Sequence, residues 1–218
     1  MKRAAGLGLA FVLGGAMLAA CGSKPRQPDW LVNADSAQER FARAYLSGDE
    51  RVANAEFALL RSALTSTGNP ALVARGELTR CAVRVAALDF QPCSAFDALR
   101  DDAPKEERAY ADFLDGRPAA AQDLPEAYRA IAGGKGGAAA LEDIEDPVSR
   151  VVAAAVLLRS GRADPRVLQV AADTASQQGW RRAVLAWLGA QLMRAEQAGA
   201  TEEAARLRRR IAIAAGGK

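Results

Sequence analysis

The chain has no histidine and few aromatic residues, and both shortages narrow what it can do. None of its 218 residues is histidine, and Phe, Trp and Tyr together make up 6%. Without histidine the chain cannot build Ser-His-Asp or Cys-His nucleophile systems, histidine-ligated metal sites or an imidazole proton shuttle. We therefore expect a protein that is not an enzyme and that binds no metal ion.

A large excess of either charge is also missing. Two of the 29 basic residues, Lys2 and Arg3, lie in the segment interpreted below as a leader, so the rest of the chain carries 27 basic and 26 acidic residues. Because these numbers are nearly equal, the chain creates only a weak long-range electrostatic field to attract phosphate groups. Nucleic acid is therefore not expected as a partner.

Residues 1–20 have the pattern of a secretory signal. Met-Lys-Arg is followed by an apolar run from Ala4 to Ala20, interrupted only by glycines, and then by Cys21. A charged start, an apolar run and a small-residue end are the parts of such a signal. The run is 17 residues long, which is short for a spanning helix, and its glycines weaken it further. We expect this signal peptide to be removed.

The end of this segment, Leu18-Ala19-Ala20-Cys21, resembles the lipobox of bacterial lipoproteins. The resemblance implies a diacylglyceryl group on the thiol of Cys21, cleavage just before it, and acylation of the new amino terminus. Two or three acyl chains hold a protein on a membrane essentially permanently. Lipid on Cys21 is thus the only non-protein group expected, with no cofactor; the alternative is an ordinary secretory leader with a chance cysteine.

The residues after Cys21 indicate the membrane in which the protein is located. Gly22 stands where inner-membrane lipoproteins of enterobacteria carry Asp, so in a Gram-negative host the resemblance implies the periplasmic side of the outer membrane. In another host it implies the cell membrane. Residues 21–34 are expected to form a lipidated tether, whose two prolines, Pro25 and Pro28, favour extended polyproline geometry. At about 3.1 Å per residue, the tether would keep the body within ~30 Å of the bilayer.

From Asp35 onward the chain predicts an all-α fold. Apolar residues recur at helical spacing between Gly, Pro and Asp, and almost no segment alternates with period two. Short loops between helices favour antiparallel helical hairpins, stacked as a bundle or a short α-solenoid. The capping box Ser36-Ala37-Gln38-Glu39 predicts the start of the first helix. Later helices are expected to begin near Glu50, Pro70, Pro104, Pro147, Pro165, Trp180 and Thr201.

Four glycines among residues 133–137 predict a hinge or turn, because glycine carries a large ordering entropy. This segment would separate an N-terminal helical subdomain, residues 35–132, from a C-terminal helical hairpin subdomain, residues 133–218. A phosphate-binding loop is the alternative interpretation. It is disfavoured because Gly136, rather than Ser or Thr, follows Lys135, and no strand precedes the segment.

Two segments near the C-terminus resemble a helical hairpin of the tetratricopeptide repeats. They are Ala186-Trp187-Leu188-Gly189 and the stretch from Gly199 to Leu207. The resemblance implies a pair of antiparallel helices of the kind that stacks on similar pairs.

Cys81 and Cys93 remain after Cys21 is assigned to lipid, and an even pair in an oxidising compartment predicts a disulfide. Cys81 lies about 10 Å before Leu88 by helical rise, and the residues from Leu88 to Cys93 can reach back up to ~16 Å. A catalytic or redox role would need a Cys-x-x-Cys motif or a neighbour that stabilises a thiolate, for which Arg80 and Arg84 are the candidates.

The two acidic clusters and the one basic cluster can each be interpreted in two ways. The acids at 101–107 and 142–146 stand around predicted helix starts, where negative side chains favour the helix dipole; a metal or acid–base site is the alternative. The basic last helix presents either a solvated face or a contact with a partner or anionic lipid. Its candidate contact residues are Arg206, Arg208, Arg209 and Arg210.

Two functions follow from these patterns. The favoured hypothesis is a membrane-anchored, periplasm-facing, non-catalytic interaction or scaffold lipoprotein, which holds an envelope protein partner in a groove between helical hairpins. The alternative is an envelope enzyme, or an activator of a peptidoglycan-acting enzyme, with two carboxylates converging in a concave pocket as acid and base. The sequence predicts no oligomeric state.

Overall fold

The computed structural model describes residues 27–216, and every regular element in that range is helical. The predicted all-α class is confirmed. The predicted leader, the lipobox and Cys21 lie outside the described residues. Within the described part, no helix is long and apolar enough to cross a membrane.

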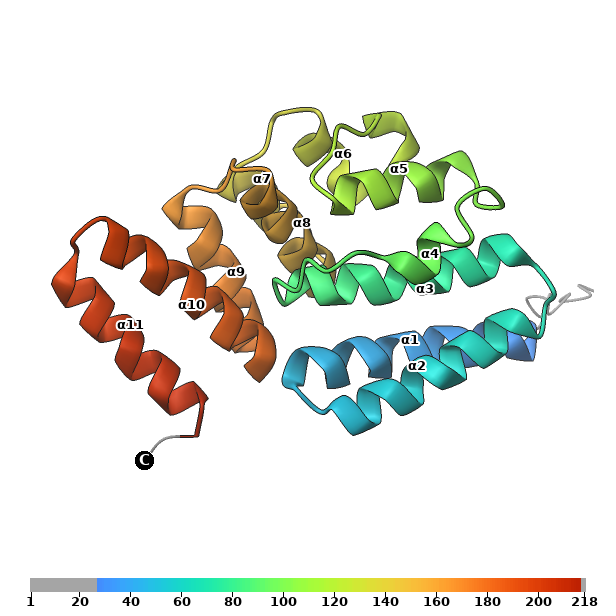
Figure 1. Cartoon of the computed structure of the whole chain (residues 1–218), viewed down its shortest axis with the longest axis horizontal. Helices are drawn as coiled ribbons and strands as arrows, with labels where there is room; N and C mark the ends of the chain where they lie inside the picture. Colours follow the sequence, from blue (N-terminus) through green and yellow to red (C-terminus); the bar gives the residue numbers. More distant parts are fainter. Residues whose placement is uncertain (1–26, 217–218) are drawn as a thin grey trace, which may run out of the picture.

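The helices form an elongated body (Figure 1). The start of α1 and the α2–α3 turn lie at one end of the long axis and α11 at the other, with α3 and α8 between them. The first part contains α1 Asp29–Ser47, α2 Glu50–Thr65 and α3 Pro70–Ala86. Short elements follow: α4 Ser94–Asp97, α5 Lys105–Leu114, η1 Ala121–Asp123, α6 Glu126–Ala132 and α7 Ala138–Glu142. The last part contains α8 Pro147–Arg159, α9 Pro165–Gln177, α10 Arg181–Gln197 and α11 Thr201–Ala214.

Three long helices begin where their prolines predicted, each directly after an Asn or Asp residue. Asn69, Asp146 and Asp164 each accept a hydrogen bond from a backbone N–H of the first turn, and a proline occupies the next position in all three cases. This arrangement satisfies free N–H groups and presets the helical φ. It fixes the starts of α3, α8 and α9.

The first helix begins at Asp29, so the start predicted from the capping box at Ser36 is wrong. Ala34 and Ala37 are 4% and 1% exposed, so the apolar stripe that contains Phe41 continues toward the N-terminus beyond the box. Burying this stripe extends the helix through a sequence that could have capped it. The segment predicted as tether, 21–34, therefore ends in helix from Asp29 onward.

One hydrophobic core runs through the described chain and includes residues from both predicted subdomains. In α8, all residues from Val151 to Leu157 are buried, as its apolar sequence predicted. The indole N–H of Trp187, on α10, donates a hydrogen bond to the carbonyl of Ala86 at the end of α3, at 3.0 Å. The guanidinium of Arg182, also on α10, lies 4.1 Å from the ring centroid of Tyr45 on α1. Helix α10 is thus packed directly on α1 and α3.

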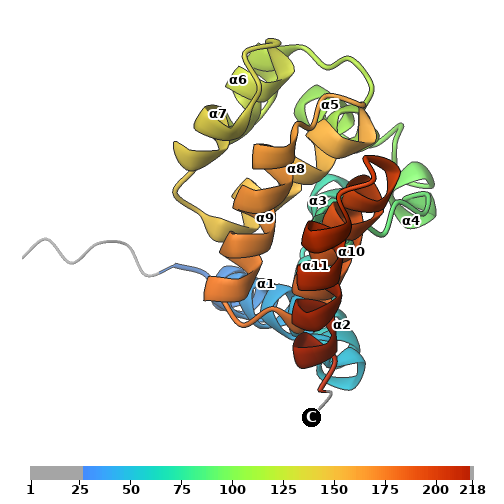
Figure 2. The same ribbon diagram turned by 90° about the vertical axis from the view of Figure 1, so that its left-hand side faces the viewer.

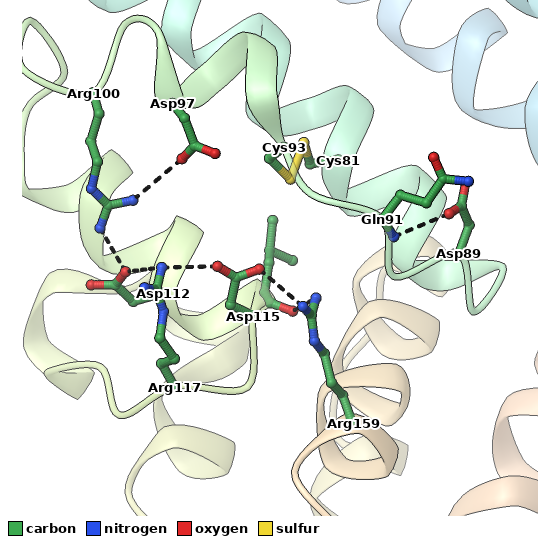
Figure 3. Close-up of polar contacts among 11 residues, drawn as sticks. Cys81, Asp89, Gln91, Cys93, Asp97, Arg100, Asp112, Asp115, Arg117 and Arg159 are labelled. Atoms are coloured by element: carbon green, nitrogen blue, oxygen red, sulfur yellow. Dashed lines mark hydrogen bonds and ion pairs between the residues drawn. A yellow bond between two sulfur atoms is a disulfide. The ribbon is translucent and has the colours of Figure 1, made fainter.

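The sulfur atoms of Cys81 and Cys93 lie at disulfide distance, with their Cα atoms 5.9 Å apart (Figure 3). The predicted pairing is confirmed in this sense. The chain reverses at Leu88, whose φ of 59° is the left-handed conformation that usually ends a helix at glycine. The cysteine pair then holds the returning segment against α3.

Candidate functional site

The last three helices form two tight antiparallel hairpins around α10. Gly179 and Gly199 both adopt φ 68°, which lets the chain reverse within a few residues between α9 and α10 and between α10 and α11. Both neighbours pack on α10; Figure 1 shows α11, α10 and α9 in succession, and Figure 2 shows α11 in front of α10 with α9 beside them. They leave an open depression, called here the α9–α11 groove.

The α9–α11 groove has an apolar floor and a polar rim. Its volume is about 430 Å³. The floor contains Leu168, Ala195 and Leu207, which are buried side chains from the three helices. The rim carries groups that donate or accept hydrogen bonds: Gln169, Asp173, Gln191, Arg194, Glu203, Arg206 and Arg210.

Internal contacts occupy part of this rim. The amide of Gln191 donates to the carbonyl of Leu168 at 2.9 Å and so ties α10 to α9. Arg206 forms a two-point contact with Glu203; this hydrogen bonding raises the pKa of Arg206 and lowers the pKa of Glu203. Arg210 Nη2 lies 3.9 Å from Asp173 Oδ1, which is a long ion pair across the groove. Arg194 is exposed and has no ion pair within residues 27–216.

The four predicted contact arginines do not share one face. Arg206 and Arg210 line the groove, whereas Arg208 pairs with Glu196 of α10 and Arg209 is exposed outside the groove. Sequence reasoning missed Gln169, Gln191 and Arg194. Their helical spacing relative to the buried Leu168 and Ala195 is visible in the sequence, but only the packing of α9 and α11 shows which face becomes concave.

A second cavity of about 340 Å³ lies between α3, α5, η1 and α6. Two of its acids already have basic partners: Glu107 accepts from Arg75 Nε at 2.8 Å, and Asp123 accepts from Lys105 Nζ at 2.8 Å. An acid–base pair for hydrolysis needs carboxylates that are free to accept and give protons. These carboxylates do not form such a pair.

Tyr110, which lines this cavity, stacks on a second tyrosine. The rings of Tyr110 and Tyr128 stack with centroids 5.4 Å apart. Burial raises the pKa of Tyr110 well above its usual value and also raises the pKa of Tyr128. Both phenols therefore stay protonated at neutral pH and act as packing groups rather than bases.

A chain of alternating charges links α4, α5 and α8 near the cysteine pair (Figure 3). Arg100 contacts Asp112 at 2.6 Å, and Arg117 contacts Asp112 at 2.7 Å and Asp115 at 2.8 Å. Arg159 of α8 then contacts Asp115 at 3.3 Å and donates to the carbonyl of Leu114. Every acid in this chain is paired, so the chain fastens helices together. Across residues 27–216, no group of three or more Cys, Asp or Glu side chains is arranged to hold a metal ion.

The described molecule is thus an all-α protein of packed helical hairpins whose last three helices form an open groove. Comparisons with protein-family models, with curated proteins and with solved structures find no match to the chain.

Proposed function

We propose that this protein is a lipid-anchored, periplasm-facing component of the bacterial envelope, and that it holds a protein partner in the α9–α11 groove. The lipobox at Leu18–Cys21 supports the anchor. The groove supports the binding role, because an apolar floor beneath a rim of hydrogen-bonding groups is the composition of protein-recognition surfaces. The outer membrane is the location that Gly22 favours.

The observation that carries the binding role is that exposed polar side chains and buried leucines line the same groove. Arg194 and Gln169 are exposed at the rim, and Leu168 and Leu207 are buried on the floor. An amphipathic helix or an extended segment could cover the leucines with apolar side chains and pair with the rim. The groove opens to solvent, and within residues 27–216 the only ion pair across it is the long contact between Arg210 and Asp173 at 3.9 Å.

Photocrosslinking in intact cells tests the binding role. A photoreactive residue at Gln169 or Arg194 should capture the same envelope protein, and one at Arg51, an exposed position on α2, should not. Failure to obtain a reproducible adduct at either groove position, or an equal adduct at Arg51, would refute the assignment.

Fractionation tests the anchor separately. The Cys21→Ser variant should be absent from the membrane fraction. The purified wild type should carry the mass of fatty acids on Cys21, which is its first residue after cleavage. A serine variant that stays in the membrane fraction would refute lipidation as the means of attachment.

A further inference from the structure

Large exposed apolar side chains occur on two helix pairs of the described chain, α1–α2 and α10–α11. Within residues 27–216, the large exposed ones are Val32, Leu59, Met193 and Ile213. Val32 is 46% exposed and Leu59 is 56% exposed; they belong to the α1–α2 hairpin. Met193 and Ile213 lie on α10 and α11, toward the other end of the long axis (Figure 1).

The α1–α2 hairpin is also hollowed beside Leu59. A shallow depression of about 690 Å³ lies between the two helices. Its apolar members are Trp30, Leu59 and Ala63, and its small polar members are Asn33, Ser36, Ser62 and Ser66. Asn33 also borders Val32 in an adjoining depression. We call Trp30, Val32, Asn33 and Leu59 the α1 entry face, because the chain enters the body there.

This composition matches the zone between lipid headgroups and acyl chains. An indole has an apolar body and one N–H donor, and tryptophan is enriched at that depth in membrane proteins. The charges near the face balance, since Arg40 pairs with Glu56 at 2.9 Å. Asp29 lies next to Val32 and is exposed, but Lys24 and Arg26 precede it in the chain, so no excess of one charge marks the face. The face therefore suits zwitterionic lipid and apolar contact rather than attraction to anionic lipid.

Chain length determines which occupant can reach the face. Asp29 follows Cys21 by eight residues, and eight residues span at most ~28 Å when fully extended. A lipid on Cys21 would therefore keep the start of α1 within that distance of the leaflet. We propose that the α1 entry face lies on the same leaflet that holds the lipid, with Trp30, Val32 and Leu59 in contact with phospholipid. This assignment depends on the lipidation of Cys21 proposed above.

Such contact would orient the whole body. The α1 entry face and α11 lie at opposite ends of the long axis (Figure 1), so the α9–α11 groove would be held away from the bilayer. A partner could then reach the groove from the aqueous space without competing with the membrane.

The chain carries its own probe for this contact. Of its three tryptophans, Trp180 and Trp187 are 6% and 0% exposed, while Trp30 packs against the core with part of its side chain still accessible. The lipidated full-length protein, bound to phosphatidylcholine vesicles with brominated acyl chains, should show quenching of tryptophan fluorescence. The Trp30→Phe variant should lose that quenching. The quenching should persist at high salt, because the contact is apolar.

Two substitutions at exposed side chains distinguish contact through the α1 entry face from attachment through the lipid anchor. Val32→Asp combined with Leu59→Asp should abolish the quenching, although the protein still floats with the vesicles through its lipid. The matched control Ile213→Asp, at a side chain 74% exposed, should leave quenching unchanged. Circular dichroism confirms that each variant is folded.

The outcomes distinguish the two proposals. A vesicle-bound, lipidated wild type with no quenching, or quenching that survives Trp30→Phe, would overturn the α1 entry face and leave the anchor intact. Purified protein without fatty-acid mass would overturn the anchor and the face with it.

Discussion

The helices after residue 146 and the segment between α3 and α8 are stabilised by different kinds of interaction. Helices α8 to α11 contain 13, 13, 17 and 14 residues, and they are held mainly by buried apolar side chains such as Val152, Leu157 and Trp187. Between α3 and α8 the helices have 4 to 10 residues, and the segment adds the cysteine pair, the charge chain and stacked tyrosines. Short helices bury little apolar area and are marginal alone, so this segment depends on links between specific groups.

The largest effect is expected in the apolar part. Trp187→Ala removes a fully buried ring and the donor to the Ala86 carbonyl, and should lower the free energy of unfolding by about 3–5 kcal/mol. Urea titration measures this loss. Met193→Ala, on the same helix at a side chain 58% exposed, should change stability by about 0.5 kcal/mol or less. Equal losses in the two variants would contradict the dependence on burial.

Removal of the cysteine pair should come next. The double variant Cys81→Ala with Cys93→Ala opens a loop with a sequence separation of 12 and should cost about 3 kcal/mol in the chain-entropy account. Hydrogen exchange should show faster opening of α4 and α5, with α9 to α11 protected as before. Uniform loss of protection would contradict the idea that the pair acts locally, and free alkylatable thiols in the unreduced wild type would contradict the pair itself.

The same contrast explains what the sequence could predict. Where a proline starts a helix and periodic apolar residues fill it, as in Pro147–Arg159, the predicted start agrees with the structure. The start predicted at Thr201 also agrees, although no side chain caps α11 there. The chain reversal at Leu88 could not be predicted, because no glycine stands at this position. The start of α1 was predicted wrongly, because burial of Ala34 and Ala37 extends the helix beyond the local capping sequence. The cysteine pair was predictable from count and spacing.

The candidate site was predictable only in part. The basic run in α11 supplied Arg206 and Arg210, but the face on which Gln169 and Arg194 meet them depends on packing between three helices. The charge chain of the middle segment joins residues far apart in sequence, from Arg100 to Arg159. Such pairings have no local signal, so sequence reasoning could not have found them.

A single carboxylate in the middle segment should show a pH signature. Asp89 accepts from Arg84 Nε at 2.9 Å and Nη2 at 3.1 Å and from the Tyr45 hydroxyl. The hydrogen bond from Arg84 is the main cause that lowers the pKa of Asp89. A lowered pKa means that Asp89 contributes stability above the ordinary aspartate pKa of about 4, and that this contribution is lost as pH falls through the lowered pKa.

The Asp89→Asn variant tests this contribution. At pH 7 it should be less stable than the wild type by about 1 kcal/mol, since the pair is partly exposed. The difference should shrink as the pH is lowered below the ordinary aspartate pKa. Asp102→Asn, at an exposed residue of the same segment, should give no difference at either pH. A gap between Asp89→Asn and wild type that is constant with pH would show that the amide change, not the charge, matters.

The smallest effect on stability is expected at Arg194 on the rim of the α9–α11 groove, because this side chain is exposed and makes no ion pair within residues 27–216. Arg194→Glu and Arg209→Glu both change exposed side chains and should each alter unfolding by about 0.5 kcal/mol or less. Only Arg194 lines the groove, so Arg194→Glu should abolish the crosslink formed from Gln169, whereas Arg209→Glu should preserve it. If both reversals weakened the crosslink equally, the partner would be responding to net charge on the last helices. In that case the concave shape of the groove would not determine recognition.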